Sequence, residues 1–200
     1  MQGYIGYFGL ESWWLEELEP HERELICQRY SERGTSNSGQ QLLEETRFSF
    51  VGMSPVQFLN GVAGCFRKDG ERDFAYRVID KAQALITSDT QILDVHFLMM
   101  TKIELTYRDV RSPDGIERCI AACREQIAIA PQAANAFQSE YAGPLVEHTG
   151  YKRLVMLLEG IGYYIECVRI CEEALAAGWS GDWEKRAARC RARTNLVDGI

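Results

Sequence analysis

Apolar residues recur every three or four positions along most of this 200-residue chain, which predicts helices. Residues 10–32 show this spacing, and Pro20 divides them into two helices. A turn or linker at 34–39 and a weak pattern at 40–52 follow. Helical spacing then returns in seven segments: 55–68, 71–86, 91–108, 115–130, about 150–160, about 163–177 and 182–194. No segment alternates convincingly as a strand does, and Leu42 to Val51 comes nearest. We therefore expect an all-α fold.

Turn and capping signals separate these helices. Ser54-Pro55 starts a helix with a capping side chain and a proline in the first turn. Thr149 is the expected N-cap of the helix at about 150–160, and Pro131 is expected to stop the helix at 115–130. These signals pair the helices into three hairpins at about 55–87, 91–131 and 150–179.

The second helices of the hairpins share one pattern. Cys119-x3-Cys123 and Cys167-x3-Cys171 lie 48 residues apart in similar surroundings, and Ala75-x3-Ile79 occupies the same place in the first hairpin. The first helices share another pattern, in Val62-Ala63-x2-Phe66, Ile103-Glu104-x2-Tyr107 and Leu154-Val155-x2-Leu158. Repeated spacing of this kind is typical of stacked helical hairpins.

This double pattern resembles the tetratricopeptide repeat over roughly residues 55–183. The chain departs from the repeat at Glu104, where a small residue is usual, and in the long link at 132–149. The resemblance implies a short right-handed stack of about three hairpins. Helices in 1–53 would pack on the first hairpin, and the helix at 182–194 would cap the stack within 54–200. We expect both parts to form one structural domain.

In tetratricopeptide proteins the first helix of each hairpin lines a concave groove that holds a partner segment. The resemblance implies a lining of Gln57, Asn60, Gly64, Arg67, Leu98, Thr101, Leu105, Arg108, Lys152, Met156 and Glu159. Three cations in this set, Arg67, Arg108 and Lys152, would suit an acidic peptide or a C-terminal carboxylate. The alternative is ordinary charge on a solvated helix face.

The paired cysteines have three interpretations: packing, metal binding or redox chemistry. We expect packing, because Cys behaves as a small buried hydrophobe and no further ligand spacing accompanies the pairs. The histidines His21, His96 and His148 are scattered, and we expect surface or partly buried side chains. No nucleophile elbow, phosphate loop or metalloprotease motif is present in the sequence. We expect no enzyme activity, no metal and no cofactor.

The net charge of −7 opposes a nucleic acid or an anionic membrane as partner. The stretch 184–193 is basic although the chain as a whole is acidic. It has one acid and five bases: Lys185, Arg186, Arg189, Arg191 and Arg193. It predicts either a solvated face on the last helix or a basic docking site for an acidic partner or RNA.

The N-terminal residues Tyr4, Tyr7, Phe8, Trp13 and Trp14 form a dense aromatic group. It is expected either to cover the first hairpin or to serve as an interface for a homo-oligomer or another partner. The absence of a signal-like start and of long apolar runs, together with seven cysteines, favours a cytoplasmic protein without a membrane partner. The leading functional hypothesis is a non-enzymatic protein-interaction module or scaffold; the alternative is an RNA- or nucleoprotein-associated protein.

Overall fold

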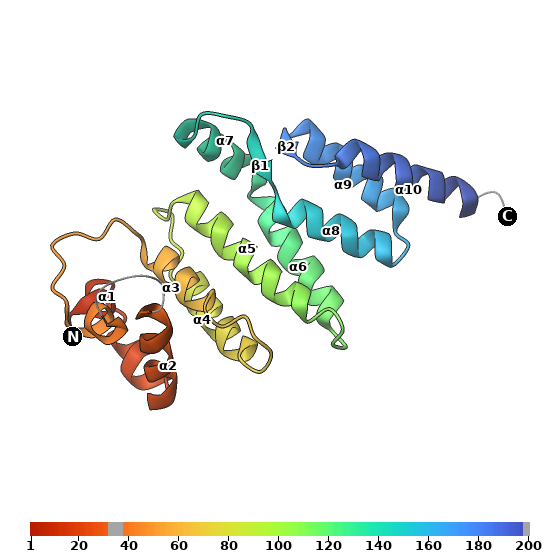
Figure 1. Cartoon of the computed structure of the whole chain (residues 1–200). Helices are drawn as coiled ribbons and strands as arrows, with labels where there is room; N and C mark the ends of the chain where they lie inside the picture. Colours follow the sequence, from red (N-terminus) through yellow and green to blue (C-terminus); the bar gives the residue numbers. More distant parts are fainter. Residues whose placement is uncertain (32–37, 198–200) are drawn as a thin grey trace. The chain divides into compact units, whose positions relative to one another are not determined.

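Helices dominate the structure, a computed structural model that describes residues 1–31 and 38–197 (Figure 1). The prediction of a mostly helical chain is confirmed, and the predicted linker at 34–39 lies largely outside the described residues. The chain divides into two compact units, Met1–Thr90 and Gln91–Ile200. The boundary predicted at residues 53 and 54 falls inside the first unit.

Six helical segments make up the described part of the first unit. They are α1 (Gly3–Tyr7), the π-helical turn η1 (Trp13–Glu17), α2 (Pro20–Ser31), the π-helical turn η2 (Gln41–Glu45), α3 (Pro55–Ala63) and α4 (Arg72–Ala84). Pro20 begins α2 as predicted. The weak pattern at 40–52 contains η2, so the helical turn there was missed.

The chain's start is attached to η2 by backbone hydrogen bonds. Gln2 N–H donates to Glu44 O at 3.1 Å, and Gly3 N–H donates to Thr46 O at 2.8 Å. Gly3 has φ +65, and a Cβ at this residue would lie 2.1 Å from the carbonyl oxygen of Leu43. Only glycine fits so close an approach in this conformation, so the residue type fixes where α1 lies.

The α3–α4 hairpin forms from the predicted signals. Ser54 is the N-cap of α3, and its hydroxyl accepts a hydrogen bond from Gln57 N–H at 3.0 Å. The facing sides of the hairpin are buried, with Phe58, Leu59 and Val62 from α3 and Ala75, Val78 and Ile79 from α4. α3 nevertheless ends at Ala63, five residues before the predicted end.

The N-terminal aromatic group packs within the first unit. The ring of Tyr4 stacks on Phe48 at 4.6 Å and lies 5.6 Å from Phe58 of α3. The ring of Phe8 lies 5.5 Å from Phe58. The indole of buried Trp14 donates to Glu44 at 2.7 Å. These contacts favour the covering role, and the oligomer interface stays a prediction.

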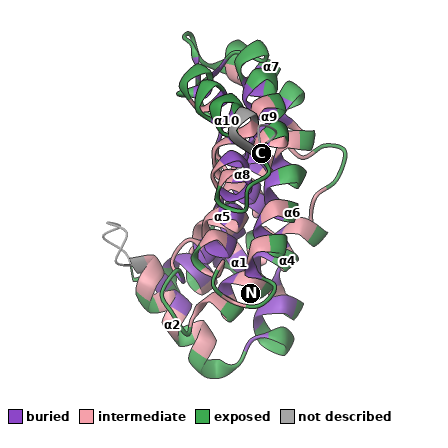
Figure 2. Ribbon diagram, turned by 90° about the vertical axis from the view of Figure 1, so that its right-hand side faces the viewer, coloured by how far each residue is buried: buried purple, intermediate pink, exposed green. Residues whose placement is uncertain are grey.

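The second unit contains two further hairpins. Its elements are α5 (Ile92–Arg108), α6 (Gly115–Ala128), α7 (Ala130–Glu140), β1 (Leu145–Glu147), α8 (Thr149–Gly160), α9 (Tyr164–Ala176), β2 (Trp179–Ser180) and α10 (Trp183–Val197). α5 packs on α6, α6 on α8, α8 on α9 and α9 on α10. Figure 2 shows the buried residues on the sides of these helices that face one another.

The paired cysteines hold equivalent places in the two hairpins of this unit. The thiol of Cys119 on α6 lies 4.0 Å from the carbonyl of Ile103 on α5. The thiol of Cys167 on α9 lies 3.5 Å from the carbonyl of Val155 on α8. In both cases a small side chain lets a second helix approach the backbone of its own first helix.

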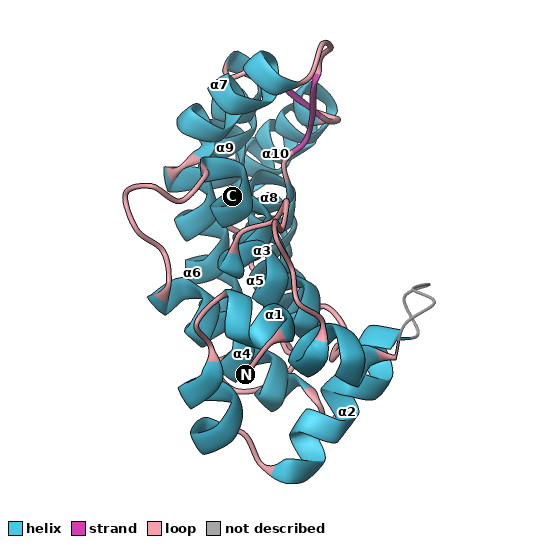
Figure 3. Cartoon of the chain, turned by 90° about the vertical axis from the view of Figure 1, so that its left-hand side faces the viewer, coloured by secondary structure: helices cyan, strands magenta, loops and turns pink. Residues whose placement is uncertain are grey.

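The link between the hairpins contains a helix and a strand that the periodicity did not predict. Pro131 lies in the first turn of α7, where its missing N–H has no cost, so it begins a helix as well as following one. Beyond α7, β1 pairs in parallel with β2, and Figure 3 shows these strands side by side. α7 itself packs on α5 and β1.

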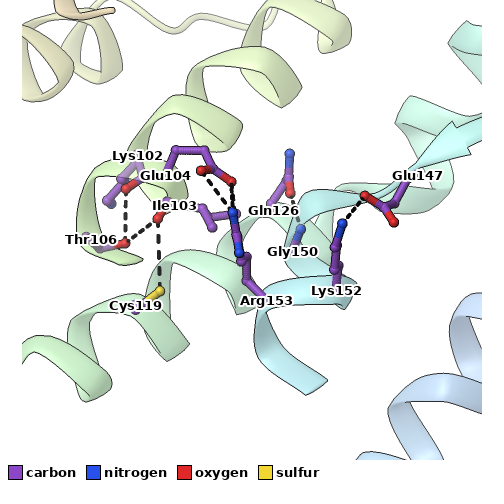
Figure 4. Close-up of polar contacts among 10 residues, drawn as sticks. All are labelled: Lys102, Ile103, Glu104, Thr106, Cys119, Gln126, Glu147, Gly150, Lys152 and Arg153. Carbon is purple, nitrogen blue, oxygen red and sulfur yellow. Dashed lines mark hydrogen bonds and ion pairs between the residues drawn. The ribbon is translucent and has the colours of Figure 1, made fainter. Parts of the chain in front are cut away.

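One buried side chain joins three elements of the second unit. Gln126 of α6 is fully buried, and its amide nitrogen donates to His96 O on α5 at 3.0 Å. Its amide oxygen accepts from Gly150 N–H on α8 at 2.7 Å (Figure 4). A Cβ at Gly150 would lie 2.9 Å from this amide oxygen and 3.0 Å from Cys123 O. The bridge therefore depends on both residue types.

Replacing Gln126 with Leu removes both hydrogen bonds and leaves the buried Gly150 N–H, in the first turn of α8, without a partner, whereas His96 O keeps its hydrogen bond within α5. We expect a loss of about 2 kcal/mol in the unfolding free energy of the second unit. Urea unfolding followed by circular dichroism measures this loss. Gln138→Leu, on the exposed side of α7, is the matched control and should change stability by about 0.5 kcal/mol or less. Equal effects of the two variants would contradict the bridging role.

Candidate functional site

The first-helix face predicted to line a groove is not open along α5. Thr101 is only 3% exposed, and Leu98 and Leu105 are fully buried. Arg108 is exposed in the last turn of α5. Three of the four predicted α5 residues are therefore unable to contact a partner at this surface.

The predicted residues of α8 are more accessible but already engaged. Lys152 pairs with Glu147 of β1 at 2.7 Å, while Met156 and Glu159 are half-buried (Figure 4). Beside Lys152, Arg153 makes a two-nitrogen contact with Glu104 on α5 at 3.1–3.2 Å. The unusual Glu104 thus pairs with a cation of the next hairpin, and this face is held by internal ion pairs.

The remaining predicted groove residues belong to the first unit. Gln57 and Arg67 are exposed, and Asn60 and Gly64 are half-buried. Arg67 lies in the first unit, whereas Arg108 and Lys152 lie in the second. A groove shared by the three cations stays a prediction.

The basic face of α10 is occupied by one carboxylate. Arg189 contacts both oxygens of Glu159 at 2.7 and 2.8 Å, and Arg193 and Arg186 lie 3.5 and 4.0 Å from the same group. These arginines hold the pKa of Glu159 below its usual range. Of the five bases, Arg191 pairs instead with Glu172, and only Lys185 makes no ion pair within the described part of the chain. The arginines thus bind α10 to the end of α8.

The cysteines of both pairs are buried, as the packing interpretation requires. Burial raises the pKa of Cys167 to about 12 and that of Cys171 to about 11, so reactive thiolate is scarce at neutral pH. Within residues 1–31 and 38–197, no group of three or more His, Cys, Asp or Glu side chains is placed to hold a metal ion. None of the described helices is long and apolar enough to cross a membrane.

Two histidines depart from the expected surface positions. His96 and His148 are 3% and 0% exposed, and their rings lie 5.1 Å apart. His148, and not the predicted Thr149, is the N-cap of α8: its Nδ1 accepts from Tyr151 N–H at 3.3 Å. A clue in the sequence was His96 within the apolar spacing of 91–108, where a polar residue is unexpected.

A groove of the second unit lies on the side of the second helices. It measures about 800 Å³ and is mainly apolar. We call it the α6–α9 groove, and its lining is Pro113, Ile116, Glu117, Ile120, Ala121, Arg124, Leu158, Ile161, Tyr163 and Glu166. Ile161 and Tyr163, in the turn between α8 and α9, are 44% and 62% exposed. The neighbouring Ile165 is 74% exposed, so the apolar surface continues beyond the groove.

Sequence reasoning missed this groove although a signal was present. The turn after α8 reads Ile161-Gly162-Tyr163-Tyr164-Ile165, where turns usually carry small polar residues. Gly162, with φ +85, makes the turn and leaves the neighbouring apolar side chains in solvent. Large apolar residues in such a turn are a sign of a contact surface.

Comparisons of the chain with protein-family models, with curated proteins and with solved structures find no match. The site must therefore be interpreted from its own geometry.

The buried histidine pair predicts an acid-sensitive second unit. Burial lowers the pKa of His96 to about 4 and that of His148 to about 3, from an ordinary value of 6.5. Below pH 6.5 the unfolded chain therefore binds more protons than the folded chain, so stability falls as pH falls. Between pH 6.5 and 5, we expect each histidine to lower the free energy of unfolding by roughly 1.4 kcal/mol for each pH unit.

Urea unfolding of wild type and His96→Phe between pH 7 and 5 measures this effect. The variant keeps a ring, removes one titrating group and should lose stability about half as steeply. The pKa of Glu159 is held below its usual range, so this carboxylate does not titrate in this window and does not contribute to the measured change. His21→Gln, at an exposed position, is the control and should retain the wild-type slope. A wild-type slope in His96→Phe would contradict the assignment.

Proposed function

We propose that this protein is a non-enzymatic protein-interaction module of the tetratricopeptide-like helical-repeat type. In both the α5–α6 and the α8–α9 hairpin, the first cysteine of the second helix approaches a backbone carbonyl of the first helix, and the two carbonyls differ by one position in the repeat; this similarity supports the repeat. The observation that carries the function is the α6–α9 groove, with apolar side chains exposed in and beside it. Contiguous exposed apolar surface of this kind is typical of protein contact sites.

The partner that fits the groove best is an amphipathic helix. Ile116, Ile120 and Arg124 follow one another at intervals of four residues along α6, and Glu117 and Ala121 form a parallel row. From Pro113 to Arg124 the groove extends for about 16 Å, which is three turns of helix. A helix bonds its own backbone internally, so it suits a lining made of apolar side chains better than an extended segment does.

The charged residues of the groove set the direction of this helix. Glu117 and Arg124 lie about 10 Å apart along α6, and neither makes an ion pair with another described residue. Glu166, beside Arg124, is already paired with Arg169 at 2.7 Å. A partner helix would therefore place a cation at Glu117 and an acid at Arg124. Because acids favour helix N-termini and cations favour C-termini, this helix would run antiparallel to α6.

This proposal moves the binding surface away from the first helices. There, Thr101 is buried and Lys152 is paired with Glu147. The RNA-associated alternative stays a prediction, but the four arginines of α10 pair with three acids, Glu159, Asp182 and Glu172, which offsets much of the positive charge on this helix.

A displayed library of helical peptides of about 16 residues, selected on the intact protein, tests the proposal. We expect enrichment of apolar residues at intervals of three and four, with an acid toward the N-terminus and a base toward the C-terminus. Ile161→Glu should weaken binding of a selected peptide by at least about tenfold, because it places a charge in the apolar groove. Fluorescence anisotropy measures the affinity.

The matched control is Leu175→Glu, because Leu175 is 47% exposed on α9 and lies outside the groove. It should leave the affinity unchanged. Glu117→Lys should weaken binding, and a peptide with its base replaced by an acid should restore it. Failure to select any peptide, or equal loss in both glutamate variants, would refute the groove as the site. A dimer that Ile161→Glu dissociates would assign the groove to a second copy of the chain instead.

A further inference from the structure

The second unit also contains a largely buried group of four rings, and none of these rings lines the α6–α9 groove. His96 of α5, Phe137 of α7, His148 before α8 and Trp179 of β2 form this ring cluster. The ring of Trp179 stacks on His96 at 6.0 Å and meets His148 edge-on at 4.6 Å. Phe137 contacts His96 at 5.4 Å and Trp179 at 5.9 Å. Four elements that are distant in sequence thus place two imidazoles and an indole together.

Three nitrogen atoms of the ring cluster have no hydrogen-bond partner among the described residues: His96 Nδ1, His148 Nε2 and Trp179 Nε1. All three side chains are at most 3% exposed. Two other buried tryptophans are satisfied: Trp14 donates to Glu44 and Trp183 donates to the carbonyl of Trp179, both at 2.7 Å. A buried polar atom without a partner costs about 1–3 kcal/mol, so three in one cluster require an explanation.

The protonation of the cluster identifies what is missing. Burial lowers the pKa of His96 and His148 well below neutrality, so both rings are uncharged. Since His148 Nδ1 accepts from Tyr151 N–H, the single proton of this ring lies on Nε2. Nε2–H of His148 and Nε1–H of Trp179 are therefore two donors without an acceptor. The missing partner is an acceptor atom.

An apolar pocket of about 470 Å³ adjoins the ring cluster. It is lined by Phe97, Phe137, Tyr141, Ala142, Gly143, Pro144, Leu145 and Val146. Three of these residues also contact the cluster: Phe97 lies 5.6 Å from His96, Phe137 belongs to the cluster, and Leu145 pairs with Trp179 in the sheet. Phe137 thus belongs both to the pocket lining and to the ring cluster.

We propose that the pocket and the ring cluster form one binding site for a small, neutral, planar and mainly apolar molecule that carries a hydrogen-bond acceptor oxygen. The molecule's body lies among the aromatic side chains of the pocket, and its oxygen accepts from His148 and Trp179 after the ring of Phe137 turns aside. A carboxylate does not suit the site, because the cluster offers no cation to offset the burial of a charge. A neutral ketone, ester or similar carbonyl compound matches both the volume and the donors.

Acetophenone and α-methylstyrene are suitable probes, because they share one shape and differ in a carbonyl oxygen against a CH2 group. The indole N–H signals of the four tryptophans, followed by NMR, report binding, and Trp179→Phe assigns the signal of Trp179. We expect acetophenone to shift the Trp179 signal saturably and to bind at least about tenfold more tightly than α-methylstyrene. Equal affinity of the two probes, or no saturable shift, would overturn the proposal.

Two variants separate the donors from the pocket. His148→Ser keeps a side-chain acceptor for Tyr151 N–H, and its short hydroxyl does not extend to the place of the Nε2–H donor, so it should lose most of the preference for the ketone. Tyr141→Ala removes an exposed wall of the pocket and should weaken both probes equally. Persistence of the full ketone preference in His148→Ser would show that the His148 donor takes no part in binding. Neither variant touches the α6–α9 groove, so this test is independent of the proposed interaction function.

Discussion

The second unit depends on the need of buried backbone groups for hydrogen-bond partners. Where α5, α6 and α8 meet, Gly150 N–H in the first turn of α8 has no partner within its own helix, and the amide of Gln126 accepts from it while donating to His96 O. A neutral amide offers both a donor and an acceptor, so one side chain serves both helices. The bridge sets the distance between two hairpins, and it places His96 close to His148, two residues before Gly150. Both the repeat packing and the ring cluster follow from this arrangement.

The hairpin helices could be predicted because their signals are local. Ser54-Pro55, the apolar spacing and the matching Cys119 and Cys167 positions act within a few turns of chain. α7 was not predicted because Pro131 is compatible with both the end of one helix and the start of another. β1 and β2 have two or three residues each, too few for a period to be recognised, and they form only because distant segments meet.

The candidate site was harder to predict than the fold for a physical reason. Exposure along a helix depends on what other elements cover, and Thr101 looks like a surface residue from its own sequence surroundings. The groove predicted from the resemblance to tetratricopeptide proteins requires accessible first helices. In this chain, Arg153 pairs with Glu104 and Lys152 pairs with Glu147 beside α5 and α8. The apolar turn at 161–165 was visible in the sequence, but its meaning depended on the adjoining face of α6.

The short parallel pairing of β1 with β2 has a consequence for how the chain can evolve. Arrays of uniform hairpins gain and lose copies easily, since each copy contacts only its neighbours. Here β1 precedes the α8–α9 hairpin and β2 follows it, so their pairing joins the chain before this hairpin to the chain after it. Duplicating or deleting the hairpin would separate the strands and displace Trp179. A change in the number of hairpins would therefore cost this unit its strand pairing as well as its helix contacts.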